Sequence, residues 1–242
     1  MKIGELAEKL VSWIKERVTA NGCEGVVLGM SGGVDSSVAA VLCQKAFPQS
    51  TLGVLIPCYS SREDEEHALA VAGSFSISTR TVVLDSVFDG LLKVLPDAGA
   101  EPAAGRMAQA NLKVRLRMLT LYYFANQLKY MVAGSSNKSE LAIGYFTKYG
   151  DGGVDILPLG NLVKGQVREL AGFLGIPREI IDKPPSAGLW PGQTDEGDLG
   201  FSYETLDRYL VTGEVTAETK RRIEPMMTAG NHKRLPPPLP TF

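Results

Sequence analysis

A short run of glycines and hydroxyl side chains is the part of the sequence best suited to chemistry. It reads GMSGGVDSS over residues 29–37 and overlaps the end of the apolar run EGVVLGM at 24–30. Glycines let a backbone approach an anion closely, and the first N–H groups of a helix donate to phosphate oxygens where the helix dipole is positive. The lysine of a Walker A loop is missing, and the pattern is not GxGxxG. We expect a different type of phosphate-binding loop, made of Gly29, Met30, Ser31, Gly32, Gly33, Val34, Asp35 and Ser36.

Asp35 and Glu140 are the candidate metal ligands. Asp35 would repel phosphate unless a divalent cation lay between them, so its place in the loop indicates Mg²⁺. Glu140 follows a second apolar run, YMVAG at 130–134. Because the carboxyl ends of parallel strands meet at one edge of a sheet, both carboxylates could face one ion. The alternative is local, since aspartate and serine cap helices in many proteins and Glu140 could cap the short helix after SSNKS.

Alternating apolar and amphipathic segments predict the elements that position these residues. We expect strands at 24–30, 51–57, 80–85 and 130–136, and helices at 4–18, 36–45, 62–75, 86–95, 107–128 and 163–174. Strands that alternate with helices form crossover units and a parallel sheet. The predicted fold is therefore α/β, a three-layer open parallel sheet with helices on both faces, Rossmann-like, in a single domain over residues 1–242.

The remaining segments are expected to be loops, short helices and a tail. PDAGAEPAAG at 96–105 has a loop composition, and GYFTKYGDGGVDILPLG from 144 to 160 reads as an ordered Gly-rich loop. Two short helices and the tail NHKRLPPPLPTF follow KPPSAGLWPGQTDEGDLG. In the 107–128 helix, a stripe of Leu112, Leu116, Leu119 and Tyr123 is expected to include the core contacts, whereas Asn111 and Arg115 share another face. Arg115 there needs an anionic partner, either an internal acid or a ligand.

Composition excludes several classes of protein. The chain has 242 residues and a formal charge of −2, with 44% hydrophobic and 21% charged residues, so it lacks the overall basic field of a nucleic-acid binder. Its three cysteines form no CxxC pair, which favours a reducing cytoplasm over a disulfide framework. No apolar run suits a membrane span or a secretory signal. With only two histidines, HExxH is excluded, and His67 in REDEEHALA reads as part of a solvated helix face.

Several motifs together resemble one family. SGGVDSS resembles the SGGxDS loop of the PP-loop ATP pyrophosphatases, which cleave ATP between its α- and β-phosphates. NLKVRLRM (111–118), GSSNKSEL (134–141), GYFTKYGDGGVD (144–155), KPPSAGLWPGQTDE (183–196) and HKR (232–234) resemble NAD synthetase in that order, over nearly the whole chain. The resemblance implies an adenine nucleotide alpha hydrolase-like fold. It also implies a ligase that amidates deamido-NAD to NAD with ammonia, through an acyl-adenylate and with release of AMP and pyrophosphate.

The resemblance also implies residue roles. Mg²⁺ and ATP would be held at the loop, at Asp35 and Glu140, and by Lys164, Ser135 and Ser186, the two serines standing where the family more often has threonine. Deamido-NAD would contact Arg115, Lys148, Asp155, His232 and Lys233. Asp151 would orient ammonia, and the protein would be a cytoplasmic homodimer. On composition alone, Lys164 could be a solvated surface lysine and the tail a frayed polyproline segment.

Some features leave alternatives open. Val34 stands where many bacterial relatives have glutamine, and NKSE replaces a DHAAE found in some of them. Another PP-loop enzyme, such as the synthetase half of a GMP synthase or a tRNA-modifying ligase, is one competitor, although near-neutral charge and TKYGDGG argue against both. An ATP sensor without catalysis is the other. The chain has no room for a glutaminase domain, so free ammonia is the expected donor, and residues 183–196, with Trp190, Asp195 and Glu196, are expected to form a lid.

Overall fold

Four parallel strands form the sheet at the centre of the computed structural model, which describes residues 1–96, 98–190 and 192–241. The strands are β1 (Gly25–Gly29), β2 (Thr51–Leu55), β3 (Ser78–Thr81) and β4 (Tyr130–Val132). Their order is β3-β2-β1-β4, and every neighbouring pair is parallel. The predicted α/β class with an open parallel sheet is confirmed.

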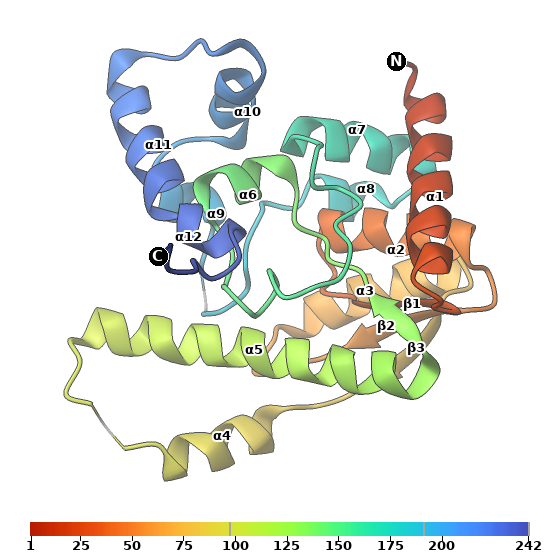
Figure 1. Ribbon diagram of the computed structural model, residues 1–242, viewed down its shortest axis with the longest axis horizontal. Helices are drawn as coiled ribbons and strands as arrows, with labels where there is room; N and C mark the ends of the chain where they lie inside the picture. The colour runs from red at the N-terminus through yellow and green to blue at the C-terminus, as the bar shows by residue number, and fades with distance from the viewer. Residues whose placement is uncertain (97, 191, 242) are drawn as a thin grey trace.

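Helices cover both faces of the sheet, as the alternation of side chains along β1 shows. Val26 and Leu28 belong to one apolar cluster, and Val27 between them belongs to the other. Helices α1 (Ile3–Ala20), α2 (Val34–Ala46), α3 (Arg62–Ser74), α7 (Lys164–Leu174) and α8 (Arg178–Ile181) contribute to the first cluster. Helices α4 (Asp85–Val94) and α5 (Pro102–Leu128) contribute to the second and lie below the strands in Figure 1. The expected three layers are therefore present.

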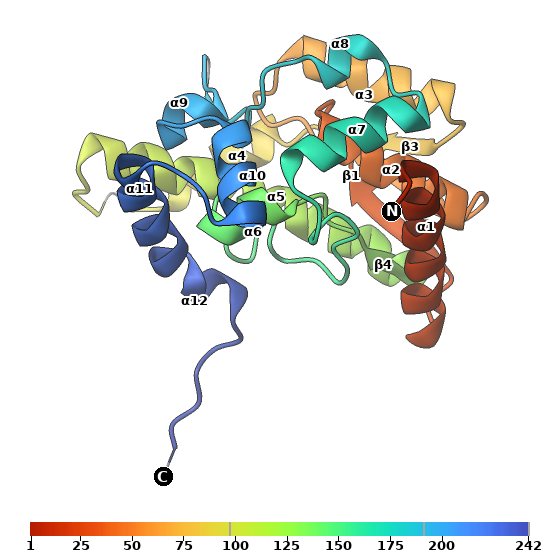
Figure 2. The ribbon, with the colours of Figure 1, turned by 90° about the horizontal axis from the view of Figure 1, so that it is seen from above.

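A third apolar cluster joins the C-terminal helices to the sheet domain. It gathers α6 (Lys138–Ile143), α9 (Asp195–Leu199), α10 (Tyr203–Thr212) and α11 (Ala217–Ala229) around buried Tyr203, Leu206 and Ile223. Residues 231–234, which composition favoured as part of a polyproline tail, form the short helix α12 (Asn231–Arg234) instead. The described residues after α12, 235–241, extend away from the body (Figure 2). Phe242 of the predicted tail lies outside the described residues.

Several predicted boundaries were wrong, and two of them have a clear physical reason. The strand expected at 80–85 is β3, Ser78–Thr81, because an edge strand pairs through its backbone and does not need apolar side chains. The loop expected at 96–105 ends early, since α5 begins at Pro102, a residue that fits the first turn of a helix. Asp97 in that loop lies outside the described residues.

The apolar stripe predicted along α5 was rotated from the true contact face. Leu119 is 64% exposed and Tyr123 is 59% exposed, whereas Leu121 and Ala125 are buried against the sheet. Leu112 and Leu116 are half-buried beside that cluster. Helix α5 has 27 residues and is longer than this small sheet is wide, so not every apolar residue along it can meet the sheet. Spacing alone therefore did not identify the buried face. No helix in the described ranges is long and apolar enough to cross a membrane.

Candidate active site

The Gly-Ser loop lies at the carboxyl end of β1 and packs closely against α3. Gly32 has a φ of 77°, in the left-handed region that glycine adopts readily. A Cβ atom at Gly32 would lie 2.1 Å from the backbone oxygen of Asp64 in the first turn of α3. Any larger residue at position 32 would therefore displace the loop or the helix.

Hydrogen bonds between hydroxyl and backbone groups hold the loop in shape. The backbone N–H of Ser31 donates to Ser36 Oγ at 3.3 Å, and both Ser36 and Ser37 donate through Oγ to the carbonyl oxygen of Gly33 at 3.0 and 2.9 Å. Helix α2 begins at Val34, and in the described part of the chain no side chain caps its N-terminus. Asp35 and Ser36 thus lie inside the helix, which contradicts the capping alternative and leaves the first N–H groups available to an anion.

Asp35, Glu140 and Lys164 form an ion-pair cluster beside this loop. Lys164 Nζ lies 2.5 Å from Asp35 Oδ2 and 3.2 Å from Glu140 Oε1. Lys164 is 3% exposed, so its alternative interpretation as a solvated surface lysine is wrong. Its backbone N–H also donates to Ser139 Oγ at 3.2 Å, which fixes the start of α7 against α6. The predicted convergence of the two carboxylates is therefore observed, with an ammonium group between them.

Asn137 supplies the other donors to the two carboxylates. Its Nδ2 donates to Asp35 Oδ1 at 2.8 Å, and its backbone N–H donates to Glu140 Oε2 at 3.2 Å. Asn137 and Glu140 also form a capping box at the start of α6. Glu140 therefore caps its helix and faces Asp35 at the same time, so the two interpretations offered for it hold together.

Burial and charge oppose each other in this cluster. Burial raises the pKa of Glu140 to about 7. The ammonium of Lys164 lowers this pKa, but it does not cancel the effect of burial, because two carboxylates share the one ammonium. Burial alone would lower the pKa of Lys164, but Asp35 and Glu140 together raise it above its usual value. The lysine therefore stays charged and works as the internal counter-ion of the site.

The chemistry of the cluster suits a magnesium ion, although no group of three or more His, Cys, Asp or Glu residues in the described ranges could hold a metal without other ligands. Magnesium in nucleotide enzymes is usually held by one or two carboxylates together with phosphates and water. Asp35 and Glu140 provide two carboxylates, and the ammonium of Lys164 is a cation already held between them. The donor set fits Mg²⁺ that arrives together with a nucleotide.

The Gly-rich segment is a rigid loop clamped from both sides. Thr147 donates through Oγ1 to Asn111 Oδ1 at 2.6 Å, and its backbone N–H donates to Asp151 Oδ1 at 2.7 Å. Arg115 Nε donates to the carbonyl oxygen of Lys148 at 3.3 Å, and Lys148 Nζ donates to the carbonyl oxygen of His232 at 2.8 Å. Helix α5 and helix α12 therefore fix the loop together.

Asp151 and Arg115, which both belong to the clamped region, differ in how closely the protein surrounds their charged groups. Asp151 is exposed as a residue, yet protein atoms crowd its carboxyl group and raise its pKa. Arg115 is exposed, and it donates a hydrogen bond to a backbone carbonyl oxygen rather than to an internal acid. Arg117, which the sequence left without a functional role, donates to the carbonyl oxygen of Ile56 and to Ser60 Oγ and is a structural residue.

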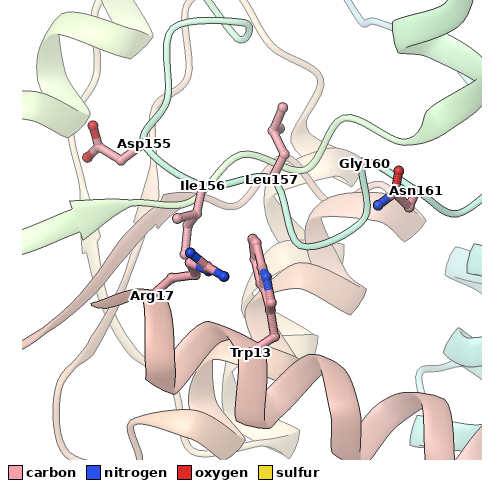
Figure 3. A pocket seen from close by; sticks show the side chains of 7 residues that line it. All are labelled: Trp13, Arg17, Asp155, Ile156, Leu157, Gly160 and Asn161. Carbon is pink, nitrogen blue, oxygen red and sulfur yellow. The ribbon is translucent and has the colours of Figure 1, made fainter. Parts of the chain in front are cut away.

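Asp155 is fixed where the Gly-rich loop rejoins the sheet. Its two carboxylate oxygens accept hydrogen bonds from the Tyr122 hydroxyl at 2.9 Å and from the backbone N–H of Val132 at 2.8 Å. Burial first, and Asp155 second, raise the pKa of Tyr122. Asp155 also borders an open pocket of about 560 Å³ (Figure 3), lined by Trp13, Arg17, Asp155, Ile156, Leu157, Gly160 and Asn161.

Trp13 and Arg17 are pocket residues that the sequence assigned only to an amphipathic helix. They lie four positions apart on α1, and the Arg17 guanidinium carbon is 5.8 Å from the centre of the Trp13 ring. An aromatic residue followed four positions later by arginine on a predicted helix was the available signal. This signal predicted only packing, because helical spacing alone does not distinguish a core residue from a pocket residue.

The other predicted ligand residues lie on three separate segments. Ser135 is half-buried after β4, and Ser186 is exposed and accepts a hydrogen bond from the backbone N–H of Gly188 at 3.1 Å. His232 is exposed on α12. Lys233 donates through Nζ to the carbonyl oxygens of Gly144 and Phe146 at 2.8 and 2.9 Å, so it also clamps the Gly-rich loop. Pro191 of the expected lid lies outside the described residues.

In its described part, the expected lid segment has two buried polar residues, Gln193 and Asp195. Asp195 is 4% exposed and begins α9, whereas Glu196 is exposed. Lys183, at the other end of the segment, pairs with Asp64 at 2.8 Å and lies 3.5 Å from His67 Nδ1. The segment is thus tied to α3, and half-buried His67 belongs to that contact rather than to a fully solvated face.

The fold and the ion-pair cluster define an α/β nucleotide-binding enzyme with its site at the carboxyl edge of a parallel sheet. The family described as NAD synthase matches residues 6–237, and the chain belongs to this family. An NH3-dependent NAD(+) synthetase from Carboxydothermus hydrogenoformans is 49% identical over 98% of this chain and 97% of the relative. The protein is therefore an ATP-binding ligase of NAD biosynthesis, which sets aside the GMP synthase, tRNA-modifying and sensor alternatives.

Solved structures agree with this membership. The NMN synthetase from Francisella tularensis has a TM-score of 0.93 and 36% identity, with 100% of both chains covered. The NH3-dependent NAD synthetase from Campylobacter jejuni has a TM-score of 0.83 and 27% identity, again with 100% of both chains covered. The predicted fold and family are confirmed.

Proposed function

We propose that this chain, acting as one domain of residues 1–242, amidates deamido-NAD to NAD through an acyl-adenylate, with the loop at 29–36 holding ATP. The observation that carries the proposal is the convergence of Asp35, Glu140 and Lys164 beside that loop. The reaction is the ATP-dependent, ammonia-dependent one of the family to which the chain belongs. The residue roles below complete it.

The first step activates the carboxylate. An oxygen of the nicotinate carboxylate attacks the α-phosphorus of ATP, and the bond to pyrophosphate breaks. Pyrophosphate leaves with its electron pair, and an acyl-adenylate remains. The N–H groups at the start of α2 and the ammonium of Lys164 stabilise the phosphates, and Ser135 and Ser186 contribute hydroxyl groups. Such preorganised donors lower the barrier by several kcal/mol.

Magnesium would be held by Asp35 and Glu140. Bound there, the ion would neutralise the negative charge that develops on the phosphates as pyrophosphate leaves. Asp35 lies in the loop and Glu140 in α6, so the ion would join the two elements. Lys164 would then be released to the nucleotide.

The second step uses ammonia. The nitrogen attacks the acyl carbon, the bond to AMP breaks, and a proton passes from nitrogen to a base while AMP leaves. Asp151, whose pKa is raised by burial, would orient the ammonia molecule and accept that proton. Its carboxylate is held by Thr147 at 2.7 Å, which fixes its orientation.

The dinucleotide would be held by the clamped loop and by α12. Lys148 and Asp155 belong to the Gly-rich loop, and Arg115 on α5 and His232 and Lys233 on α12 are the other candidate ligands. Arg115, Lys148 and Lys233 already donate to backbone carbonyl groups of the loop or of α12. Arg115 and Lys148 supply positive charge for the dinucleotide phosphates. The hydrogen bonds of Lys148 and Lys233 hold the loop in place before substrate arrives.

A homodimer would cover the exposed apolar residues of α5. Leu119 and Tyr123 lie four positions apart on one face of α5 and are 64% and 59% exposed. An apolar helix face of this kind is typical of a subunit contact. The free cysteines Cys23, Cys43 and Cys58 suit the reducing cytoplasm, which is where we place the protein.

The proposal is tested by measuring pyrophosphate release from purified chain supplied with ATP and Mg²⁺. Continuous release over many turnovers is expected only when deamido-NAD and ammonium are both present, because without ammonium each site forms one acyl-adenylate and stops, and NAD is expected in equal amount. Glutamine in place of ammonium is expected to give far less product. Pyrophosphate release without either acceptor, or NAD formation from glutamine at least as fast as from ammonium, would contradict the proposal.

A second candidate substrate is favoured by one comparison. The NMN synthetase structure from Francisella tularensis superimposes with a TM-score of 0.93 over the whole chain. The same adenylation and amidation on nicotinate mononucleotide would give the mononucleotide amide. The ratio of kcat/KM for deamido-NAD and nicotinate mononucleotide decides between them, since the preferred substrate has the higher value.

A further inference from the structure

One buried acid next to the site has no part in the roles above. Asp195 accepts a hydrogen bond at Oδ2 from the Tyr203 hydroxyl, at 3.0 Å. In the described parts of the chain its other oxygen, Oδ1, is buried and accepts no hydrogen bond. The Tyr145 hydroxyl lies close to this carboxylate but donates its proton to Asp198 Oδ2 at 2.8 Å. A buried carboxylate oxygen without a donor is costly, so Asp195 has spare capacity for a cation.

The carboxylates of Asp35 and Glu140, in contrast, have a donor at every oxygen. Asn137 serves Asp35 Oδ1 and Glu140 Oε2, and Lys164 serves Asp35 Oδ2 and Glu140 Oε1. The ammonium group thus lies where a cation shared by the two acids must lie. A divalent cation that binds Asp35 Oδ2 and Glu140 Oε1 together would take the place of the Lys164 ammonium, which would then have to move away.

Tyr203 connects the present position of the ammonium with the spare oxygen. Lys164 Nζ lies 4.9 Å from the centre of the Tyr203 ring, and the hydroxyl of the same ring is bound to Asp195. Tyr203 is 1% exposed, so the ring is fixed between the two groups. A cation is attracted to the face of an aromatic ring, which keeps a moving ammonium stabilised along this path. Asp195 also acts electrostatically on Lys164.

We propose that Asp195 is a positioning residue that receives the ammonium group of Lys164 when a divalent cation enters between Asp35 and Glu140. This inference rests on the proposed assignment of those two acids as metal ligands. The lysine then lies between Asp195 and the incoming nucleotide, and no buried charge is left unpaired during the exchange. Before nucleotide binds, the internal ammonium competes with the metal and lowers its affinity.

Direct binding of Mn²⁺, in the absence of nucleotide, tests the proposal without measuring activity. The full chain is titrated while free Mn²⁺ is followed by electron paramagnetic resonance. Lys164→Gln is expected to bind Mn²⁺ about tenfold more tightly than the wild type, because the competing ammonium is gone. Asp195→Asn is expected to bind it about tenfold more weakly, because the displaced lysine has no second carboxylate.

The double variant separates positioning from a structural effect. In the Lys164→Gln background, Asp195→Asn is expected to leave Mn²⁺ affinity unchanged, since no lysine has to move. Asp198→Asn is the matched control, because Asp198 lies on the same helix but pairs with Tyr145 and Gln193. It is expected to change affinity in neither background. An equal loss from Asp195→Asn in both backgrounds, or no gain from Lys164→Gln, would overturn the proposal.

Two further measurements distinguish a wrong metal assignment from a wrong role for Asp195, and cover the case in which a variant does not fold. If Asp35→Asn leaves Mn²⁺ binding by Lys164→Gln unchanged, the metal assignment itself is wrong, and the inference falls with it for that separate reason. If Lys164→Gln does not fold, lysine labelled at Nζ with heavy nitrogen is used in the wild type. The Lys164 signal is expected to shift on addition of saturating Mg²⁺ and to shift differently in Asp195→Asn. An unshifted signal, or the same shift in both proteins, would overturn the proposal.

Discussion

Lys164 Nζ lies 2.5 Å from Asp35 Oδ2, although the two residues are 129 positions apart in the chain. The contact joins the first turn of α7 to the loop after β1, and Glu140 on α6 completes it. Three segments of the chain therefore meet at one ammonium group. The predictions below follow from this meeting point and from the loops that surround it.

Removal of the charge on Asp35 is expected to stop catalysis while the fold remains. Asp35→Asn keeps an oxygen for Lys164 and a similar size, but it loses the carboxylate that would hold the metal. We expect kcat to fall by about a hundredfold to a thousandfold. Circular dichroism is expected to show an unchanged spectrum. A variant with more than half of the wild-type kcat would contradict the role given to Asp35.

A side chain at position 32 is expected to damage the loop. Gly32→Ala requires a Cβ atom 2.1 Å from the Asp64 carbonyl oxygen and a φ of 77°. The strained conformation alone costs about 1–2 kcal/mol, which urea unfolding would measure, and ATP affinity is expected to fall as well. Gly33→Ala is the control, because the nearest atom to its Cβ, Ser31 Oγ, is 3.6 Å away. Equal stability of the two variants would refute this account of Gly32.

Metal binding is expected to depend on pH through Glu140. Burial raises the pKa of Glu140 from 4.5 to about 7, so this carboxyl is partly protonated at neutral pH. Because the metal needs the ionised form, Mg²⁺ affinity measured by calorimetry should rise by about tenfold per pH unit below pH 7 and level off above it. Lys164 faces the same carboxyl and stays charged in this range, because Asp35 and Glu140 raise its pKa.

The same shift has the opposite effect on stability in the absence of metal. The folded chain holds the proton of Glu140 more tightly than the unfolded chain does, so the free energy of unfolding should fall as pH rises from 4.5 to about 7. Glu140→Gln is expected to remove most of this slope and the pH dependence of Mg²⁺ affinity. If the slope persists in Glu140→Gln, another group is responsible.

Loss of the Lys233 ammonium is expected to loosen the Gly-rich loop. Lys233→Met leaves the carbonyl oxygens of Gly144 and Phe146 without their donor. We expect KM for deamido-NAD to rise by about tenfold while KM for ATP stays within about twofold, because the loop contacts one substrate. Lys220→Met, which removes an exposed lysine of α11 paired with Glu224, is the control and should leave both values unchanged. An equal rise of both KM values would contradict a substrate-specific role.

Motif spacing predicted the parts of the site that lie close to the sheet. The loop at 29–36 and Glu140 each follow an apolar strand, and parallel strands bring such residues to one edge. The convergence of Asp35 and Glu140 could therefore be predicted before the structure was known. Lys164 came from the family resemblance, since a lysine at a helix start has no local feature that indicates burial.

Burial and rotation of helices could not be predicted from local pattern. Asp195 lies in an acidic, proline-bounded segment, and only packing of α9 against α10 makes it a buried residue beside Lys164. Lys233 belongs to a tail composition, yet its ammonium clamps a loop distant in sequence. The exposed Leu119 shows that an apolar stripe alone does not identify the face of a long helix that packs against the sheet. Each failure arises from a contact between distant segments.

The most direct test of the acyl-adenylate mechanism is to follow the oxygen atoms of the nicotinate carboxylate into the products. Deamido-NAD is labelled with a heavy oxygen isotope in its nicotinate carboxylate and incubated with the enzyme, ATP, Mg²⁺ and ammonium. The account predicts one labelled oxygen in the phosphate of AMP and none in pyrophosphate, because the carboxylate oxygen stays bound to the α-phosphorus when ammonia attacks. Unlabelled AMP, or ADP and labelled inorganic phosphate as products, would contradict it.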